Sequence, residues 1–178
     1  VLVLQKNYTT HATRVPVLPD IVTVDHLSED IKDLTKVPIG VNVESKYNET
    51  YDFTKDQINV ILANNISEHE NFFFSLFKIL KRIPQTKVRV LDVAKTYDNA
   101  KIPVECYTDK FDAILPALIQ EIEKTTADIK RVYVINGVSK LKSKINENTY
   151  PIYEKFFRAI KESENTIAII ADNESDYQ

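Results

Sequence analysis

From position 57 onward, short apolar runs alternate with longer segments in which apolar residues recur at every third or fourth position. The short runs are typical of buried strands, and the longer pattern is typical of helices that bury one face. This alternation indicates βαβ units and a mainly parallel sheet flanked by helices. The predicted strands are Ile58–Ala63, Val88–Val93, Val104–Tyr107, Arg131–Ile135 and Thr166–Ala171.

Three segments between these strands carry the helical pattern, and we expect them to cover the sheet. Their apolar positions fall within 72–80, 114–122 and 152–160. Pro116 should kink the second helix or mark a restart, because proline cannot donate the helical hydrogen bond. The run from Phe72 to Phe74 is predicted to lie in the core, with one ring exposed to a partner, since three successive side chains cannot share one helical face.

The N-terminal part has a different pattern. Residues 1–36 contain the apolar run Val1–Leu4 and then a proline-containing stretch, which we interpret as a strand plus an extended connector. Pro38–Val43 and Thr50–Phe53 alternate around a polar turn, which predicts a hairpin. With 178 residues, 43% of them hydrophobic, the chain suits a single domain, with the connector at 1–36 and the core at 37–178.

Composition excludes several classes of function. The net charge is −3, with 28% charged residues, so no overall field favours nucleic acid or an anionic membrane. The one short basic cluster, Lys140–Lys144, is interpreted as a solvated loop, and nucleic-acid translocation finds little support. No apolar stretch approaches the roughly 20 residues needed to cross a bilayer, so we expect a soluble piece. Because the chain has no methionine, we also expect it to be excised from a longer protein.

Cysteine and histidine offer no metal site. Cys106 is the only cysteine, so neither an internal disulfide nor a cysteine-rich metal site can form, and a reducing compartment is expected. The three histidines, His11, His26 and His69, lack the spacing of zinc ligands. We therefore expect no bound metal.

In an open α/β sheet, ligands bind at the carboxyl ends of the strands, so the turn after Ile58–Ala63 is the first candidate site. A phosphate-binding P-loop there has the pattern G-x-x-x-x-G-K-[ST], with glycines that wrap the phosphates and a lysine that reaches them. In that frame Asn64 and His69 occupy the glycine positions, Glu70 the lysine position and Asn71 the hydroxyl position. Glutamate beside a triphosphate would repel it.

An ordinary helix start explains the same residues. Ser67 and Glu70 have the spacing of a capping box, in which each side chain satisfies a free N–H group of the first turn. Glu68 and Glu70 also suit the positive end of the helix dipole. We therefore expect no nucleotide cofactor, with weak binding of ATP and Mg²⁺ as the alternative.

The second candidate site follows Arg131–Ile135. A P-loop ATPase places a Mg²⁺-binding aspartate at the end of this strand, often followed by a catalytic acid. Here Asn136 and Gly137 occupy these positions, so hydrolysis has no evident base. Considered alone, Asn136 and Gly137 would indicate only a favourable turn at the end of a strand. The candidate P-loop position after Ile58–Ala63 is what makes the second interpretation worth stating.

Taken in order, these segments resemble the FtsK/SpoIIIE family of P-loop translocases, and within it the degenerate C-terminal ATPase-like module of type VIIb secretion coupling proteins. The resemblance spans nearly the whole chain. It rests on the order and spacing of Arg14–Pro19, Val37–Val41, Tyr51–Phe53, Ile58–Asn71, Arg131–Gly137 and Thr166–Ala171.

The resemblance implies a RecA-like fold in the cytoplasmic part of a bacterial cell-membrane protein, with several ATPase modules in tandem. It implies as partners the secreted WXG-type substrates or their C-terminal signals, the adjacent modules, and a hexamer of the full-length protein. The substituted loops favour a non-catalytic role in recognition or regulation. A residual ATP-binding module completed by residues of a neighbour is the alternative.

Overall fold

The computed structural model describes residues 22–27, 31–63, 65–97, 101–124, 128–144 and 150–173. Its centre is a five-stranded sheet in the order β3-β7-β6-β4-β5, with every neighbouring pair parallel. The strands are β3 (Ile58–Ala63), β4 (Thr86–Asp92), β5 (Glu105–Tyr107), β6 (Lys130–Asn136) and β7 (Thr166–Asn173). The predicted parallel α/β fold is confirmed, with β3 at its predicted bounds and the others shifted by one or two residues at an end.

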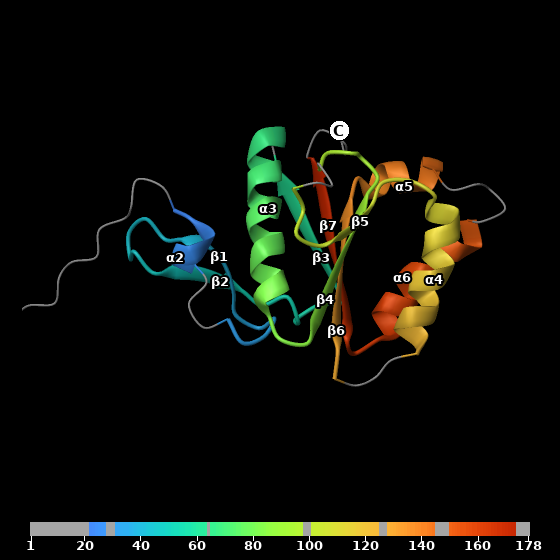
Figure 1. The fold of residues 1–178 in the computed structure, drawn as a ribbon, viewed down its shortest axis with the longest axis horizontal. Helices are drawn as coiled ribbons and strands as arrows, with labels where there is room; N and C mark the ends of the chain where they lie inside the picture. The colour runs from blue at the N-terminus through green and yellow to red at the C-terminus, as the bar shows by residue number, and fades with distance from the viewer. Residues whose placement is uncertain are drawn as a thin grey trace, which may run out of the picture.

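Helices cover both faces of the sheet (Figure 1). One face carries α3 (Ile66–Arg82), and the other carries α4 (Phe111–Glu123), α5 (Val138–Lys144) and α6 (Tyr150–Glu162). Each face has its own apolar cluster, which includes Phe73 and Phe77 on the α3 side and Leu115 and Phe156 on the other. Strand residues alternate between the two clusters, because successive side chains of a strand point to opposite faces.

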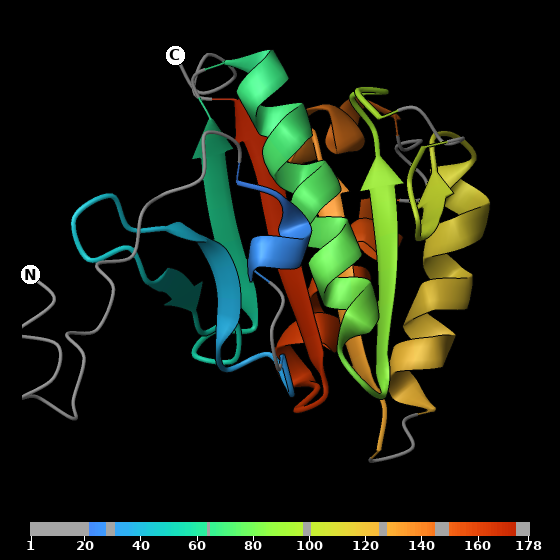
Figure 2. The ribbon, with the colours of Figure 1, turned by 60° about the vertical axis from the view of Figure 1, so that its left-hand side comes forward.

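The predicted hairpin is also present. Strands β1 (Val37–Val41) and β2 (Asn48–Tyr51) pair antiparallel, separately from the main sheet. The side chain of Asn42 stabilises the turn, since its Oδ1 accepts hydrogen bonds from the N–H groups of Glu44 and Ser45, both at 2.9 Å. The hairpin lies beside α3 and projects from the body of the domain (Figure 2).

The segment before the hairpin differs from its prediction. It contains a short helix, α2 (Val24–Leu27), where only an extended connector was expected. Leu27 and Leu34 are buried in the cluster on the α3 side, so this segment packs onto the core. The predicted strand Val1–Leu4 lies outside the described residues.

Helix α4 runs without a break through Pro116, so of the two predicted outcomes, a kink or a restart, the restart is excluded. Burial explains the continuity, because Leu115, Leu118, Ile119 and Ile122 all face the core and hold both halves of the helix against it. None of the helices among the described residues combines the length and the apolar character needed to cross a bilayer.

Candidate functional site

The turn between β3 and α3 is short, because β3 ends at Ala63 and α3 begins at Ile66. Asn65 is the N-cap residue, with extended backbone, and its Oδ1 accepts hydrogen bonds from Ser67 N at 2.9 Å and Ser67 Oγ at 2.8 Å. The predicted capping box with Ser67 as the cap is therefore wrong. Asparagine is an equally favourable cap, and its position starts the helix two residues earlier.

This early start places most of the predicted P-loop positions inside a helix. Ser67, His69, Glu70 and Asn71 all belong to α3, while Asn64 lies outside the described residues. The N–H group of His69, at the second glycine position, donates to the carbonyl of Asn65 at 3.0 Å. A phosphate cradle needs free N–H groups in a loop that wraps the ligand. The helical hydrogen bond makes this N–H unavailable for that purpose.

The His69 side chain occupies the space beside the sheet. It is only 2% exposed, its ring centroid is 4.7 Å from that of Phe73, and its ring lies nearly parallel to Tyr97 at 6.1 Å. Burial lowers the pKa of His69, and the negative charge of Asp172 opposes this shift only in part. The imidazole is therefore a neutral member of an aromatic cluster rather than a phosphate-binding cation.

Polar atoms of this cluster have no hydrogen-bond partner among the described residues. They are both ring nitrogens of His69 and the hydroxyl of Tyr97. Burial raises the pKa of Tyr97, so its phenol stays protonated. Buried polar atoms without partners are uncommon in folded proteins. They identify the start of α3 as a functional candidate.

At the end of the neighbouring strands, Asn136 pairs with a buried carboxylate. Asp92, the last residue of β4, is 0% exposed and accepts hydrogen bonds from Asn136 Nδ2 at 2.7 Å, Tyr97 N at 2.8 Å and Thr96 N at 3.1 Å. Three donors satisfy a buried carboxylate without a metal ion. The carboxylate at this end of the sheet is thus used to hold the β4 turn.

Gly137 continues this turn with φ of +81°. An added Cβ would lie 3.0 Å from Ala94 Cβ and 3.2 Å from Ala94 N, so both the backbone angle and the close approach require glycine. The Gly137 N–H also donates to the carbonyl of Ala171 at 3.0 Å. Asn136 and Gly137 therefore join β4, β6 and β7 structurally, and neither presents an acidic group to solvent.

A hollow of about 400 Å³ borders β3 and the first turns of α3. Glu68 is its one charged side chain, and the rest of its lining is mainly apolar: Ile61, Leu62, Ala63, His69, Phe72 and Phe73. Of the predicted aromatic run, Phe73 is fully buried, while Phe72 and Phe74 are half-buried against the core. The hollow suits apolar side chains better than an anion.

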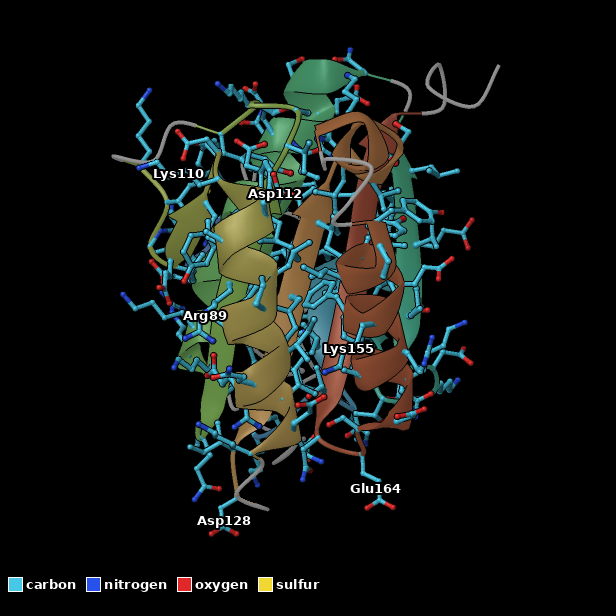
Figure 3. The ribbon with its side chains drawn as sticks, turned by 90° about the vertical axis from the view of Figure 1, so that its right-hand side faces the viewer. Arg89, Lys110, Asp112, Asp128, Lys155 and Glu164 are labelled. Atoms are coloured by element: carbon cyan, nitrogen blue, oxygen red, sulfur yellow. The ribbon has the colours of Figure 1, made fainter. Side chains whose placement is uncertain are left out.

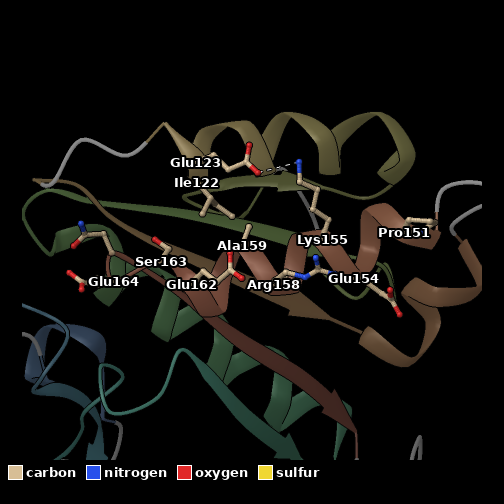
Figure 4. A pocket seen from close by; sticks show the side chains of 11 residues that line it. Ile122, Glu123, Pro151, Glu154, Lys155, Arg158, Ala159, Glu162, Ser163 and Glu164 are labelled. Atoms are coloured by element: carbon tan, nitrogen blue, oxygen red, sulfur yellow. Dashed lines mark ion pairs between the residues drawn. The ribbon is translucent and has the colours of Figure 1, made fainter.

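A second hollow, of about 850 Å³, lies between α4 and α6, away from the carboxyl ends of the strands (Figure 4). Lys155 on α6 bridges it to Glu123 on α4, with Nζ 3.2 Å from Oε1. Its remaining charged side chains are mixed in sign and exposed. Solvated charges of this kind do not indicate a reaction centre.

An ionic cluster that contains two buried guanidinium groups, those of Arg89 and Arg131, lies beside α4, and Figure 3 labels Arg89 within it. Glu121 contacts three cations: it pairs with Arg89 Nη1, lies 2.9 Å from Lys87 Nζ and 3.7 Å from Arg131 Nε. Arg89 also donates from Nε to Glu105 at 2.7 Å. Burial disfavours the charged guanidinium of Arg89, but these carboxylates outweigh it and raise its pKa. The strand β4 was expected to be apolar throughout, and the charged contacts of Arg89 show that this expectation was wrong.

Sequence reasoning located Asn136 and His69 but missed their partners Asp92 and Tyr97. Asp92 could have been recognised as an acidic residue at the carboxyl end of a predicted strand. Tyr97 gives no comparable signal, because it lies in an irregular segment after β4. Within the described residues, no group of three or more His, Cys, Asp or Glu is placed to hold a metal ion.

No family model matches the chain, and no curated protein matches it. Several solved structures match it. One is the cytoplasmic domain of EssC, with a TM-score of 0.68 and 12% sequence identity, and the match covers 99% of this chain and 39% of that chain. The cytoplasmic domain of the Thermomonospora curvata type VII secretion ATPase EccC has a TM-score of 0.61 at 13% identity, over 92% of this chain and 22% of that one.

A further match is to ATPases 2 and 3 of Thermomonospora curvata EccC in complex with a signal sequence peptide. Its TM-score is 0.60 at 14% identity, over 91% of this chain and 33% of that one. The chain thus spans well under half the length of each of these structures. At identities this low, the structural matches establish only the fold. It is the fold that the resemblance to FtsK/SpoIIIE ATPases predicted. The chain has the fold of the cytoplasmic ATPase modules of EssC and EccC.

Proposed function

We propose that this chain is a non-catalytic ATPase-like module of a type VII secretion coupling protein, and that it recognises export substrates and regulates neighbouring ATPase modules. The observation that carries the proposal is the start of α3 at Ile66, ahead of His69, Glu70 and Asn71. A loop that has become helix offers no cradle for a triphosphate. The buried Asp92 accepts its hydrogen bonds from Asn136 and from two backbone N–H groups, which supports the same conclusion for Mg²⁺.

One matched structure supports part of the proposed set of partners. EccC has been solved with a signal sequence peptide on a chain that contains ATPases 2 and 3. We therefore propose that the present module binds the C-terminal signals of WXG-type substrates and contacts adjacent ATPase modules of its own chain, within a hexamer. We also propose that the module belongs to the cytoplasmic part of a cell-membrane protein.

Titration of the protein with ATP and Mg²⁺ tests the loss of nucleotide chemistry. We expect no saturable binding in the micromolar range and no turnover, measured by calorimetry and phosphate release. A double change of Glu70→Lys and His69→Gly should restore neither, because the helix would still occupy the loop. Micromolar binding with turnover in the unmodified protein would contradict the proposal and support a residual ATPase completed by a neighbour.

A pull-down with a WXG-type substrate tests recognition separately. We expect capture of the intact substrate without ATP and loss of capture when the C-terminal signal is deleted. If neighbouring ATPase modules capture the substrate and this protein does not, its role is regulation alone.

A further inference from the structure

Asn136 and Gly137 form the only Asn-Gly pair of the chain, because the sequence has two glycines and the other follows Ile39. Among the dipeptides of a protein, Asn-Gly is the one that deamidates most readily. Glycine has no side chain, so its backbone nitrogen can approach the side-chain amide carbon of the asparagine without hindrance. The turn that joins three strands of the sheet is therefore also a chemically reactive site.

The reaction consumes only water. The nitrogen of Gly137 loses its proton to base in the solvent and forms a bond with Cγ of Asn136, while the bond from Cγ to Nδ2 breaks. The departing nitrogen takes up a proton and leaves as ammonia, so that a five-membered succinimide ring remains. Water then opens the ring at either of its two carbonyl groups, which gives aspartate or isoaspartate at position 136.

In the folded protein three hydrogen bonds oppose this reaction. The Gly137 N–H donates to the carbonyl of Ala171 at 3.0 Å, which shields its proton from base. Asn136 Nδ2 donates to Asp92 Oδ1 at 2.7 Å, and the Asn136 carbonyl accepts from Val93 N at 3.0 Å. Asn136 is 3% exposed and ends β6, and ring closure requires its ψ angle to leave the extended range of a strand. The native contacts thus keep the Gly137 nitrogen from attacking Cγ of Asn136.

The strands that hold these contacts lie inside the sheet. β6 pairs with β4 and β7, and β7 pairs with β3 and β6. The β6 residues before the turn, Val134 and Ile135, are both 0% exposed. Core strands open with the free energy of global unfolding, whereas loops and chain ends open locally. Release of the Gly137 N–H therefore requires cooperative unfolding of the domain.

Both products are incompatible with the native turn. Aspartate would place a second carboxylate at the position from which Nδ2 now donates to Asp92 at 2.7 Å, and the two negative charges would repel each other. Isoaspartate adds one backbone carbon before Gly137, where even an added Cβ would lie 3.0 Å from the Ala94 side chain. A chain that has reacted is consequently less stable and unfolds more often.

We propose that Asn136 is a site of spontaneous deamidation whose rate is set by unfolding of the domain, so that the modification permanently marks molecules that have unfolded. The fold protects the site, and the site destabilises the fold once it has reacted. The proposal goes beyond the role in recognition and is independent of it, because it concerns only the chemistry of this turn.

Incubation in mildly alkaline buffer, with and without guanidinium chloride, tests the protection. Mass spectrometry of peptides measures the mass gain at position 136, and enzymatic methylation measures isoaspartate. We expect the native protein to react at least about a hundredfold more slowly than the unfolded protein, because only a small fraction of native molecules is open at any time. In guanidinium chloride, where folding has no influence, Gly137→Ala should slow the reaction because its methyl group hinders the attacking nitrogen.

Variants that differ in stability test the link to unfolding. Glu121 pairs with Arg131, at the opposite end of β6 from Asn136. Glu121→Ala should accelerate deamidation in native buffer about a hundredfold, because it leaves buried guanidinium groups without their carboxylate. Glu123→Ala removes only an exposed ion pair on the same helix, and as the matched control it should change the rate less than about threefold. In guanidinium chloride these variants and the unmodified protein should react at equal rates.

Three results would overturn the proposal. The first is an equal rate of deamidation in the native and the unfolded protein. The second is an equal rate for Glu121→Ala and Glu123→Ala in native buffer. The third is an unchanged denaturation midpoint for protein that has reacted and been refolded. Slow reaction in the native state, acceleration by Glu121→Ala and a lower midpoint after reaction would together support it.

Discussion

The two ends of the central sheet handle buried charge in opposite ways. Beneath α4, Glu121 gathers Arg89, Arg131 and Lys87 into a charged cluster with little exposure of either arginine. At the carboxyl ends of the strands, Asp92 is satisfied by an amide and two backbone N–H groups, and no cation pairs with it in the described residues. Strong ionic interactions thus lie away from the position where an ATPase would need them.

In this protein the strong ion pairs stabilise the packing of a helix, and they do not lie where an ATPase would carry out its reaction. An ATPase site requires charged groups that remain available to a ligand, at some cost in stability. Here the carboxyl end is internally satisfied, whereas the ionic cluster fixes α4 on β4 and β6. The comparison predicts different responses to substitution at the two ends.

The largest effect is expected for Glu121→Ala, which leaves two buried guanidinium groups without their shared carboxylate. The free energy of unfolding should fall by about 3 kcal/mol, measured by urea denaturation. Glu123→Ala on the same helix is the control, since Glu123 forms an exposed pair with Lys155 and should matter by less than about 0.5 kcal/mol. Equal losses would show that Glu121 contributes no more to stability than an exposed ion-pair residue does.

Asn136→Asp restores the acidic residue of an ATPase and tests the carboxyl end. It would place a second carboxylate against Asp92, where 2.7 Å now separates donor and acceptor, and cost about 2 kcal/mol at neutral pH. The repulsion raises the pKa of the pair in the folded state, so the loss should be greatest at high pH and shrink as pH falls. Asn71→Asp, on the exposed face of α3, is the control, and a loss independent of pH would contradict the mechanism.

Asn65→Ala should lower the free energy of unfolding by about 1 kcal/mol, because two donors of Ser67 lose their acceptor. Ser67→Ala removes only one of these hydrogen bonds and should cost less. The reverse order, measured by thermal denaturation, would restore Ser67 as the cap.

At neutral pH the smallest effect is expected from the protonation of His69. Its pKa is lowered in the folded state, so the unfolded chain binds the proton more tightly. Stability should be fully present above about pH 6.5 and decline as pH falls below it, by no more than about 1.4 kcal/mol per pH unit. His69→Phe should remove this part of the decline in urea titrations at several pH values. Parallel pH profiles of the two proteins would exclude His69 as its source.

The fold was accessible from sequence because periodicity reports burial. Ile58–Ala63 is one apolar run, and its strand was predicted at its full length. The helix start was less accessible, since Asn65 and Ser67 are both good caps and local sequence does not decide between them. The pairing of Asp92 with Asn136 joins residues on separate strands, so it depends on the sheet order. The ion pairs of Arg89 could not be predicted for the same reason, because its partners Glu105 and Glu121 come from β5 and α4.

The order of the strands also affects how the protein is made. Ile58 of β3 pairs with Ala168 of β7, which is the last strand of the described chain. During synthesis, β3 leaves the ribosome long before its partner exists, and such distant pairings form slowly. Until Thr166 and the residues after it are made, both edges of an uncharged apolar segment are open to aggregation. We therefore expect early packing of α3 on β3 to lower the risk of aggregation during synthesis.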